Sequence, residues 1–419
     1  MTLDFGIAFV TGRVQFAKVL KTFFHNWLEH ELISSKRIRL HLFVVYDVNY
    51  TGAKREDFEN IAPEIRALMD SVNVYGPEEI RLEKQRLIEG SFVNPNQCDL
   101  IFGDGYGKLR NAAIHFARKQ KMDRLLFLDD DEYPVAVVKN AAGNLVWAGQ
   151  SIVESHIRYG ANADMTNGRH CGYISPIPQI VFDDSFTEDD FRPFVEAISN
   201  DIVSWDRVRT TTIENQGITY AAGDILDNQW VAPVEEINGM KFISGSNLCF
   251  NLQRLRILPV FYNPPGARGE DAFMSTTLSG YKVVRLPCYS FHDAFSAYQH
   301  ILRGVLPRKL KGIDPRSKVA MKRFLKGTIG WVRYKPLLVY ITQRKNYSSI
   351  IDDGIRKLEK TIPKLCDYFQ NEDFRSVIGE FQRYHSLVEK HFEEFEATKK
   401  AWKVLQQREQ AGLAASAMR

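Results

Sequence analysis

The fold is decided by the stretch Leu125-Leu126-Phe127-Leu128-Asp129-Asp130-Asp131-Glu132, in which four apolar residues lead directly into four carboxylates. An apolar run this short, ended by polar residues, is typical of a central parallel strand that is covered on both faces. Ligands of open α/β sheets bind at the carboxyl ends of such strands. Crowded carboxylates repel one another, and Mg²⁺ or Mn²⁺ carrying a substrate phosphate would relieve the repulsion. A solvated acidic turn is the alternative interpretation.

Composition bounds the class of protein. The chain has 419 residues, of which 44% are hydrophobic, so it can bury a large core and is long enough for roughly two or three domains. Its five cysteines lie far apart, without metal-ligand spacing or a disulfide pattern, which favours a reducing compartment. The sequence contains no basic leader and no run of about 18 uncharged apolar residues, so we expect a cytoplasmic protein.

Strand and helix signals alternate along the first 135 residues. Apolar runs predict strands over residues 5–10, 40–46 and 72–75. Periodic apolar residues predict intervening helices over residues 16–28 and 58–68. A further helix opens near Lys108 and leads into the acidic strand. This order predicts a parallel βαβ sheet in which the acids end about the fourth strand.

A glycine-rich turn, Gly103-Asp104-Gly105-Tyr106-Gly107-Lys108, precedes that helix. Such a turn at a helix start presents free amide groups and a positive dipole end to an anion, and Lys108 and Arg110 would add charge. It is neither the phosphate loop that ends in Gly-Lys-Ser/Thr nor a complete dinucleotide motif. Contact with a substrate phosphate is therefore a hypothesis beside that of an ordinary turn.

A second acidic cluster follows a segment of looser pattern. Residues 135–240 are rich in turns and aromatic side chains and predict strands and long loops of undetermined order. The run 241–250 predicts a strand interrupted by small residues, where another group can approach the backbone closely. Beyond it, Arg268-Gly269-Glu270-Asp271 opens a helix, and a strand over 281–286 leads to His292.

The order of these pieces resembles that of the GT-A glycosyltransferases, most closely family 2, over about residues 3–300. The shared pieces are Arg110-Asn111, Asp129-Asp130-Asp131, Gly245-Ser246-Asn247, Gly269-Glu270-Asp271 and His292. No single piece is specific, and their common order carries the resemblance. It implies an α/β, Rossmann-like fold with a mostly parallel central sheet, helices on both faces, and a catalytic domain over residues 1–300.

The resemblance also implies residue roles. Asp129 and Asp131 match an Asp-x-Asp motif that holds Mn²⁺ or Mg²⁺ at the two phosphates of a nucleotide sugar, and His292 matches a third metal ligand. Asp271, beside Glu270, matches the general base of inverting members, although a capping acid is its ordinary interpretation. A satisfied strand-end histidine is the ordinary interpretation of His292. The residues expected to contact the donor are Thr11, Arg13, Asp47, Lys108, Arg110, Asp129, Asp130, Gly245 and Asn247.

The implied reaction transfers a sugar from a nucleotide-diphosphate sugar to an acceptor hydroxyl, with inversion, in the synthesis of cell-surface glycans or glycoconjugates. UDP is the commonest donor nucleotide in this family, so a UDP-sugar is the favoured donor. The expected acceptor is a glycan, a lipid-linked compound or a phosphorylated compound. The signature Gln-x-x-Arg-Trp of processive synthases is absent after His292, which favours a non-processive enzyme. The long span between the acidic clusters predicts acceptor-binding structure over residues 135–240.

Three alternatives stay open. A retaining enzyme on the same fold would not use Asp271 as its base. A sugar-nucleotide pyrophosphorylase would share the sheet, but Thr11-Gly12-Arg13-Val14 is poor in glycine for its loop. A scaffold could bind a sugar nucleotide without turnover. The acids of Asp129-Asp130-Asp131 also run into Glu132 without a gap, so the pair that faces the metal is undecided.

The composition changes beyond residue 300. Residues 303–345 contain thirteen Lys and Arg against one acid, Asp314, which gives +12. This basic linker or helical segment, 301–347, is expected to meet an anion: the nucleotide diphosphate, a phosphorylated acceptor or the inner face of a membrane. A solvated basic face of a helical extension is the alternative. No groove-reading motif accompanies the charge, so nucleic acid is not an expected partner.

Periodic apolar residues continue to the C-terminal end. They predict a helical hairpin over residues 348–410 that packs on itself, on the catalytic domain or on a second copy in a homo-oligomer. The last residues, 411–419, are small and of low complexity and predict a mobile tail.

Overall fold

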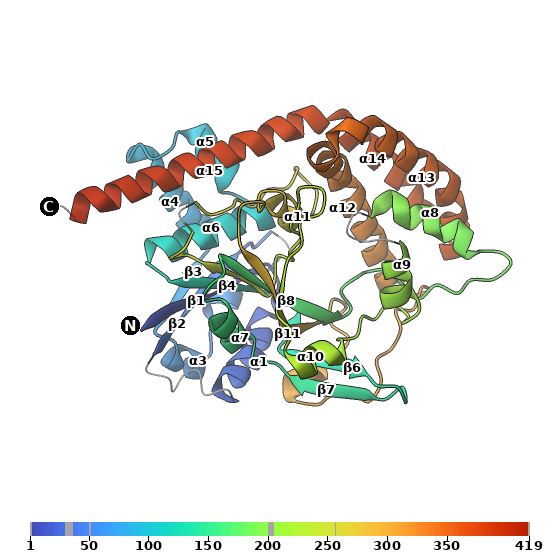
Figure 1. The fold of residues 1–419 in the computed structure, drawn as a ribbon, viewed down its shortest axis with the longest axis horizontal. Coiled ribbons are helices and arrows are strands. Elements are labelled where there is room, and N and C mark those ends of the chain that lie inside the picture. The colour runs from blue at the N-terminus through green and yellow to red at the C-terminus, as the bar shows by residue number, and fades with distance from the viewer. Residues whose placement is uncertain (1, 30–36, 50–51, 200–204, 256, 418–419) are drawn as a thin grey trace.

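The computed structural model describes residues 2–29, 37–49, 52–199, 205–255 and 257–417, which form a mixed α/β fold (Figure 1). Within these residues one sheet has nine strands: β1 (Leu3–Thr11), β2 (Ile38–Tyr46), β3 (Ser71–Tyr75), β4 (Arg124–Leu128), β5 (Glu132–Tyr133), β8 (Met165–Gly172), β9 (Ala232–Pro233), β10 (Leu248–Asn251) and β11 (Val283–His292). A separate two-stranded ribbon pairs β6 (Val135–Lys139) with β7 (Leu145–Gly149).

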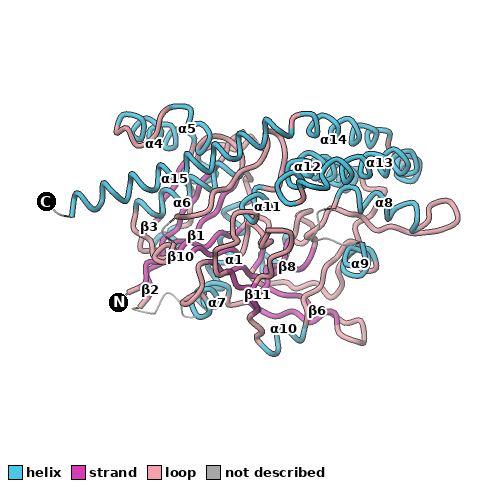
Figure 2. Tube along the Cα trace, turned by 45° about the horizontal axis from the view of Figure 1, so that its top comes forward, coloured by secondary structure: helices cyan, strands magenta, loops and turns pink. Residues whose placement is uncertain are grey.

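Helices surround the sheet (Figure 2). Their bounds are α1 (Phe16–Glu29), α2 (Glu56–Glu59), α3 (Pro63–Leu68), α4 (Pro77–Glu89), α5 (Pro95–Ile101), α6 (Tyr106–Lys119), α7 (Ile152–Tyr159), α8 (Glu188–Ile198), α9 (Trp205–Val208), α10 (Gly223–Asn228), α11 (Glu270–Ser275), α12 (Lys318–Thr342), α13 (Tyr347–Phe369), α14 (Ser376–Ser386) and α15 (Val388–Ala417). Short turns of other helix types lie at Arg209–Ile213, Gln299–Arg303, Arg344–Asn346 and Glu372–Arg375.

The strand order places several strand ends at one edge of the sheet. The order is β3-β2-β1-β4-β10-β8-β11-β5, with β9 paired to β11. β3, β2, β1 and β4 are parallel to one another. β10 is antiparallel to both β4 and β8, and β8 is parallel to β11, so β8 and β11 point the same way as β4. The carboxyl ends of β1, β2, β4 and β11 therefore share an edge.

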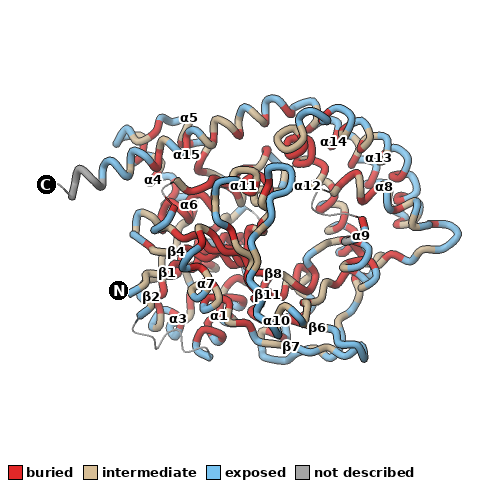
Figure 3. The backbone as a smooth tube through the Cα atoms, viewed as in Figure 1, coloured by how far each residue is buried: buried red, intermediate tan, exposed pale blue. Residues whose placement is uncertain are grey.

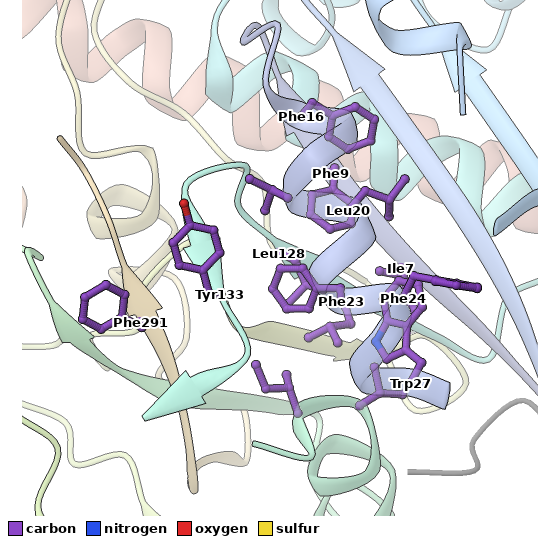
Figure 4. Close-up of a cluster of buried hydrophobic side chains, with 14 of the residues drawn as sticks. Ile7, Phe9, Phe16, Leu20, Phe23, Phe24, Trp27, Leu128, Tyr133 and Phe291 are labelled. Atoms are coloured by element: carbon purple, nitrogen blue, oxygen red, sulfur yellow. The ribbon is translucent and has the colours of Figure 1, made fainter. Parts of the chain in front are cut away.

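β1 and β4 are buried on both faces, as the sequence predicts. On one face, Ile7, Phe9 and Leu128 pack in a cluster with the aromatic side chains of α1 (Figure 4). On the other face, Val10 and Phe127 belong to the cluster that includes α6. Because alternate residues of a strand point to opposite faces, both apolar sets of each strand are used. The apolar run before the acids is therefore a central strand, and the acids start where it ends.

Two predicted segments differ in the structure. Only Leu248–Asn251 of the predicted strand 241–250 is a strand, because the preceding residues form the irregular loop that contains Gly245. Residues 135–240 are not simply an insertion, since they supply β8, which lies between β10 and β11 in the central sheet. The predicted N-terminal strands and helices correspond to β1 to β4, α1 to α3 and α6.

The C-terminal helices pack on the part of the chain that contains the sheet. A hydrophobic cluster joins α8 with α12, α13 and α14, whose outer faces are exposed (Figure 3). Three helices, α13 to α15, occupy the range for which a hairpin was predicted, and α15 runs back past α5 (Figure 1). Nε1 of Trp402 on α15 donates to the carbonyl of Leu258 at 2.9 Å. α15 continues to Ala417, so helix covers most of the predicted tail. None of the described helices combines the length and low polarity that crossing a membrane requires.

Candidate active site

The shared strand edge opens into a cavity of about 1940 Å³. Its volume exceeds the roughly 300–1,000 Å³ that is typical of sites for single small ligands. Twelve of the residues predicted for the site line it: Thr11, Arg13, Asp47, Lys108, Arg110, Asp129, Asp130, Asp131, Gly245, Glu270, Asp271 and His292. Side chains from both acidic clusters, more than one hundred residues apart in the sequence, thus reach one space.

Asp131 pairs with two basic side chains. Its Oδ2 lies 2.5 Å from Nη1 of Arg13 and 3.2 Å from Nε2 of His292. Burial alone would raise the pKa of Asp131, but the charges of His292 and Arg13 outweigh it and hold the pKa below its usual range. Burial alone would lower the pKa of His292, and the charge and hydrogen bond of Asp131 instead raise it to about 9. Both contacts therefore favour the ionised form of Asp131.

The other acids of this cluster have different partners. Oδ2 of Asp130 accepts from Oγ1 of Thr11 at 2.5 Å, and burial, opposed by Arg13, raises the pKa of Asp130 to about 7. Asp129 faces Arg110 instead. Thr11 is the last residue of β1 and Arg13 follows it, so the end of β1 contacts the end of β4 through these side chains. The gapless run of acids is tolerated because each acid has a partner: Arg110 of α6 for Asp129, Thr11 and Arg13 for Asp130, and Arg13 and His292 for Asp131.

Two of the three predicted metal ligands are arranged to share one ion. The 3.2 Å between Nε2 of His292 and Oδ2 of Asp131 is close to the separation of about 3 Å for adjacent ligands bound at about 2.1 Å. Nδ1 of His292 bonds the carbonyl of Tyr173 at 2.7 Å, the second contact that fixes a ligating histidine. Asp129 does not join them, and nowhere in the described ranges do three His, Cys, Asp or Glu side chains gather as a complete ion site. A partial set fits Mg²⁺ or Mn²⁺, whose remaining ligands are commonly water and substrate phosphate.

Arg110 connects the two acidic clusters. Its side chain is buried, and Nη2 lies 3.3 Å from Oδ1 of Asp129 while Nε lies 3.5 Å from Oε1 of Glu270. Nη1 donates to the carbonyl of Gly245, and the guanidinium carbon lies 5.4 and 5.6 Å from the ring centres of Phe127 and Phe261. The sequence predicts that Arg110 contacts the donor. In the structure Arg110 also holds Asp129 and Glu270 together, a contact that local sequence patterns do not predict.

Asp271 is held at the start of α11 with both carboxylate oxygens bonded. Oδ1 accepts from the amide of Ala272 at 2.8 Å, and Oδ2 accepts from the amide of Gly245 at 3.2 Å. Burial and the neighbouring charge of Glu270 raise the pKa of Asp271 to about 6, against the opposing effect of Arg110. A carboxylate fixed in this way, with a pKa close to neutrality, can accept a proton from a substrate hydroxyl.

Three predicted donor residues have other surroundings. Nζ of Lys108 donates to the carbonyl of Asp99 at 2.6 Å, so its ammonium is tied to the backbone. Asp47 lies at the cavity with Oδ1 accepting from the amide of Asn49 at 2.8 Å. Asn247 is fully buried, is not among the described lining residues, and accepts from Nε2 of His156 at 2.8 Å. Asn247 is therefore a buried structural residue beneath the loop that contains Gly245.

A second buried acid, Glu132, has contacts that sequence reasoning missed. Oε2 of Glu132 accepts from Oγ of Ser246 at 2.8 Å, and Oε1 lies 3.1 Å from Nε2 of His170. All three line the cavity. Burial alone would raise the pKa of Glu132, but His170 outweighs it and lowers the pKa. Both carboxylate oxygens of Glu132 thus have protein partners, so Glu132 is not a further candidate metal ligand. His170 lies on β8, and no local pattern around it signals this pairing.

Comparisons with known proteins give distant likenesses. No family model and no curated protein matches the chain. Among solved structures, one described as a nucleotide-diphospho-sugar transferase from Desulfovibrio desulfuricans G20 is 11% identical, with 41% of this chain and 59% of that chain covered and a TM-score of 0.21. Mouse xyloside xylosyltransferase 1 is 15% identical, with 42% and 55% covered and a TM-score of 0.21. The chain thus spans little more than half the length of either, and such scores assign no activity.

Proposed function

We propose that this protein is a glycosyltransferase that moves a sugar from a nucleotide-diphosphate sugar to an acceptor hydroxyl, with inversion and without processivity. One observation carries the proposal: the Asp131–His292 pair, suited to a divalent cation, and Asp271, a fixed carboxylate of raised pKa, line the same cavity. The first arrangement suits a diphosphate, and the second suits the hydroxyl that displaces it.

The donor half of the site lies at the ends of β1, β2 and β4. Thr11, Asp47 and Arg13 line this part of the cavity. In this proposal Thr11 and Asp47 contact the nucleoside, and Arg13 offers positive charge to the phosphates. Asp131 and His292 would hold Mn²⁺ or Mg²⁺. When bound, the ion would stabilise the charge that develops on the leaving diphosphate. Arg13, which contacts Asp131, adds a second positive charge beside the ion.

The acceptor half of the site contains Asp271. The acceptor hydroxyl gives its proton to a carboxylate oxygen of Asp271 while its oxygen forms a bond to the anomeric carbon. The bond from that carbon to the diphosphate oxygen breaks, and its electron pair leaves with the nucleoside diphosphate. The two amide hydrogen bonds to Asp271 keep the base in place, so the displacement occurs from the face opposite the leaving group.

Calorimetric titration of UDP, GDP, CDP and dTDP tests this function, with Mn²⁺ or with a chelator. We expect one nucleotide to bind in a metal-dependent manner, and Asp131→Asn to lose the metal dependence. Asp123→Asn is the matched control, because it removes one carboxylate at the other end of β4. Failure of all four nucleotides to bind the wild-type protein under both conditions would reject the proposal.

A further inference from the structure

The basic segment beyond residue 300 contains side chains that stabilise the packing of α12 and side chains that line the cavity. Nε of Arg333 lies 2.7 Å from Oε2 of Glu380 on α14. Nζ of Lys335 donates to the carbonyls of Glu196 and Ala197 at 3.0 and 2.6 Å, at the end of α8. These contacts stabilise the packing of α12 on its neighbours. They do not account for the basic residues nearer the start of α12.

Three cations on one side of α12 line the active-site cavity. Lys322, Arg323 and Lys326, hereafter the cationic row, are lining residues, together with Val319 one turn earlier. Their spacing of three and four residues places them on one face of the helix. Lys322 and Lys326 are exposed. The sequence of α12, from Lys318 to Thr342, contains no acidic residue that would neutralise them.

The cationic row lies toward the donor half of the site. The guanidinium carbon of Arg323 lies 5.0 Å from the centre of the Phe295 ring. Phe295 comes three residues after His292, and the next residue, Ser296, accepts from Nε2 of Gln15 near the end of β1 at 3.4 Å.

The acceptor half meets a different part of the same helix. Tyr334 of α12 packs edge-on against Phe273 of α11, with ring centres 6.3 Å apart. From Arg323 to Tyr334 the helix rises about 16 Å at about 1.5 Å per residue. Its basic start therefore lies beside the donor residues, and its aromatic continuation lies beside the helix of Asp271.

We infer that the cationic row, which lines the cavity beside the donor residues, binds the diphosphate of the donor. The inference rests on the proposed function and extends it to a segment outside the resemblance. A diphosphate that approaches Asp129, Asp130 and Asp131 meets like charge, so it requires cations on its other side. Side chains of Lys and Arg form short, charge-assisted hydrogen bonds to phosphate oxygens. The helical extension thus supplies part of the donor site.

A charge-matched pair of variants tests the inference by calorimetry. Lys322→Gln with Lys326→Gln removes two exposed cations of the row, so folding is not at stake. Lys318→Gln with Lys345→Gln removes two exposed cations of the same segment that are not among the described lining residues. We expect the first pair to weaken binding of the nucleoside diphosphate by about tenfold or more, and the second pair to leave it unchanged. Affinity for the nucleoside without phosphates should be equal in all three proteins.

The remaining outcomes separate this inference from the function on which it rests. If the wild-type protein binds a nucleoside diphosphate and the Lys322 and Lys326 variant binds it equally well, the cationic row has no part in donor binding. A phosphate-bearing acceptor is the other source of the same chemistry. Titration of inorganic phosphate into protein already saturated with nucleoside diphosphate distinguishes it. Row-dependent binding of phosphate to that complex would overturn the donor assignment, and its absence supports the assignment. If no nucleotide binds the wild-type protein, the proposed function itself fails.

Discussion

Arg110 is the side chain whose loss should disturb the site most. In Arg110→Met the apolar stem still fills the space between Phe127 and Phe261, but Asp129 and Glu270 lose their shared cation. Removing one partner of a buried ion pair costs about 3–5 kcal/mol. The lost interaction with two aromatic rings adds about 1 kcal/mol. We therefore expect the free energy of unfolding to fall by about 4 kcal/mol at pH 8.

Urea denaturation followed by tryptophan fluorescence measures this change. Lys108→Met is the control, because it removes a cation from the same helix end that bonds a backbone carbonyl, at a cost of about 1 kcal/mol. Burial raises the pKa of Asp129 to about 6 while Arg110 opposes the rise. Without Arg110 the pKa of Asp129 rises further. The variant therefore loses free energy of unfolding over a wider pH interval as the pH increases, because the buried Asp129 must ionise. The cost should therefore be smaller at pH 5 than at pH 8. A change below about 1 kcal/mol at both pH values would refute the bridging role.

Other predictions concern the base, the stereochemistry and the buried ion pairs between α4 and α6. Because the pKa of Asp271 is raised to about 6 and the base must be ionised, kcat/KM should increase as pH rises through about 6; a flat profile from pH 5 to 8 would contradict this. Asp271→Asn should lower kcat by about 10²–10⁴-fold, while loss of less than about threefold would exclude a general base. NMR of the product should show the inverted anomer, and a retained anomer would remove Asp271 from its role. Glu83→Gln should lower the free energy of unfolding by about 3 kcal/mol in urea denaturation, because buried Glu83 lies 2.7 Å from His115 and 2.6 Å from Lys119. The control Glu78→Gln, at an exposed position, should lower it by less than about 1 kcal/mol. Equal losses in the two variants would refute the argument.

The positions of both acidic clusters were predictable from the sequence. Hydrophobic runs with sharp polar ends located β1, β2 and β4, and parallel strands place such ends at one edge. The helix start at Glu270 and the strand leading to His292 follow from the same local signals. Asp131 and His292, both predicted as metal ligands, lie 3.2 Å apart in the structure, and their binding of a metal stays a prediction.

What the sequence could not give are contacts between distant segments. Arg110 meets Gly245 across 135 residues, and Ser246 meets Glu132 across 114 residues. No local periodicity records such partners. Asn247 is another example. Its position two residues after Gly245 led to the prediction that it contacts the donor, but its backbone has a φ of 49° and its side chain is fully buried. The net charge of α12 was visible, but which cations line the cavity depends on how the helix packs.

Consumption of nucleotide sugars tests the central claim most directly. The wild-type protein and Asp271→Asn would be incubated with Mn²⁺, a panel of UDP-, GDP-, CDP- and dTDP-sugars and a mixture of glycan, lipid-linked and phosphorylated acceptors, and the released nucleoside diphosphate would be quantified. We predict that the wild-type protein consumes one class of donor and forms a new glycoside, and that Asp271→Asn binds the same donor but turns it over much more slowly. Binding of a nucleoside diphosphate without consumption of any donor in the panel would contradict the account and favour a scaffold that binds sugar nucleotides.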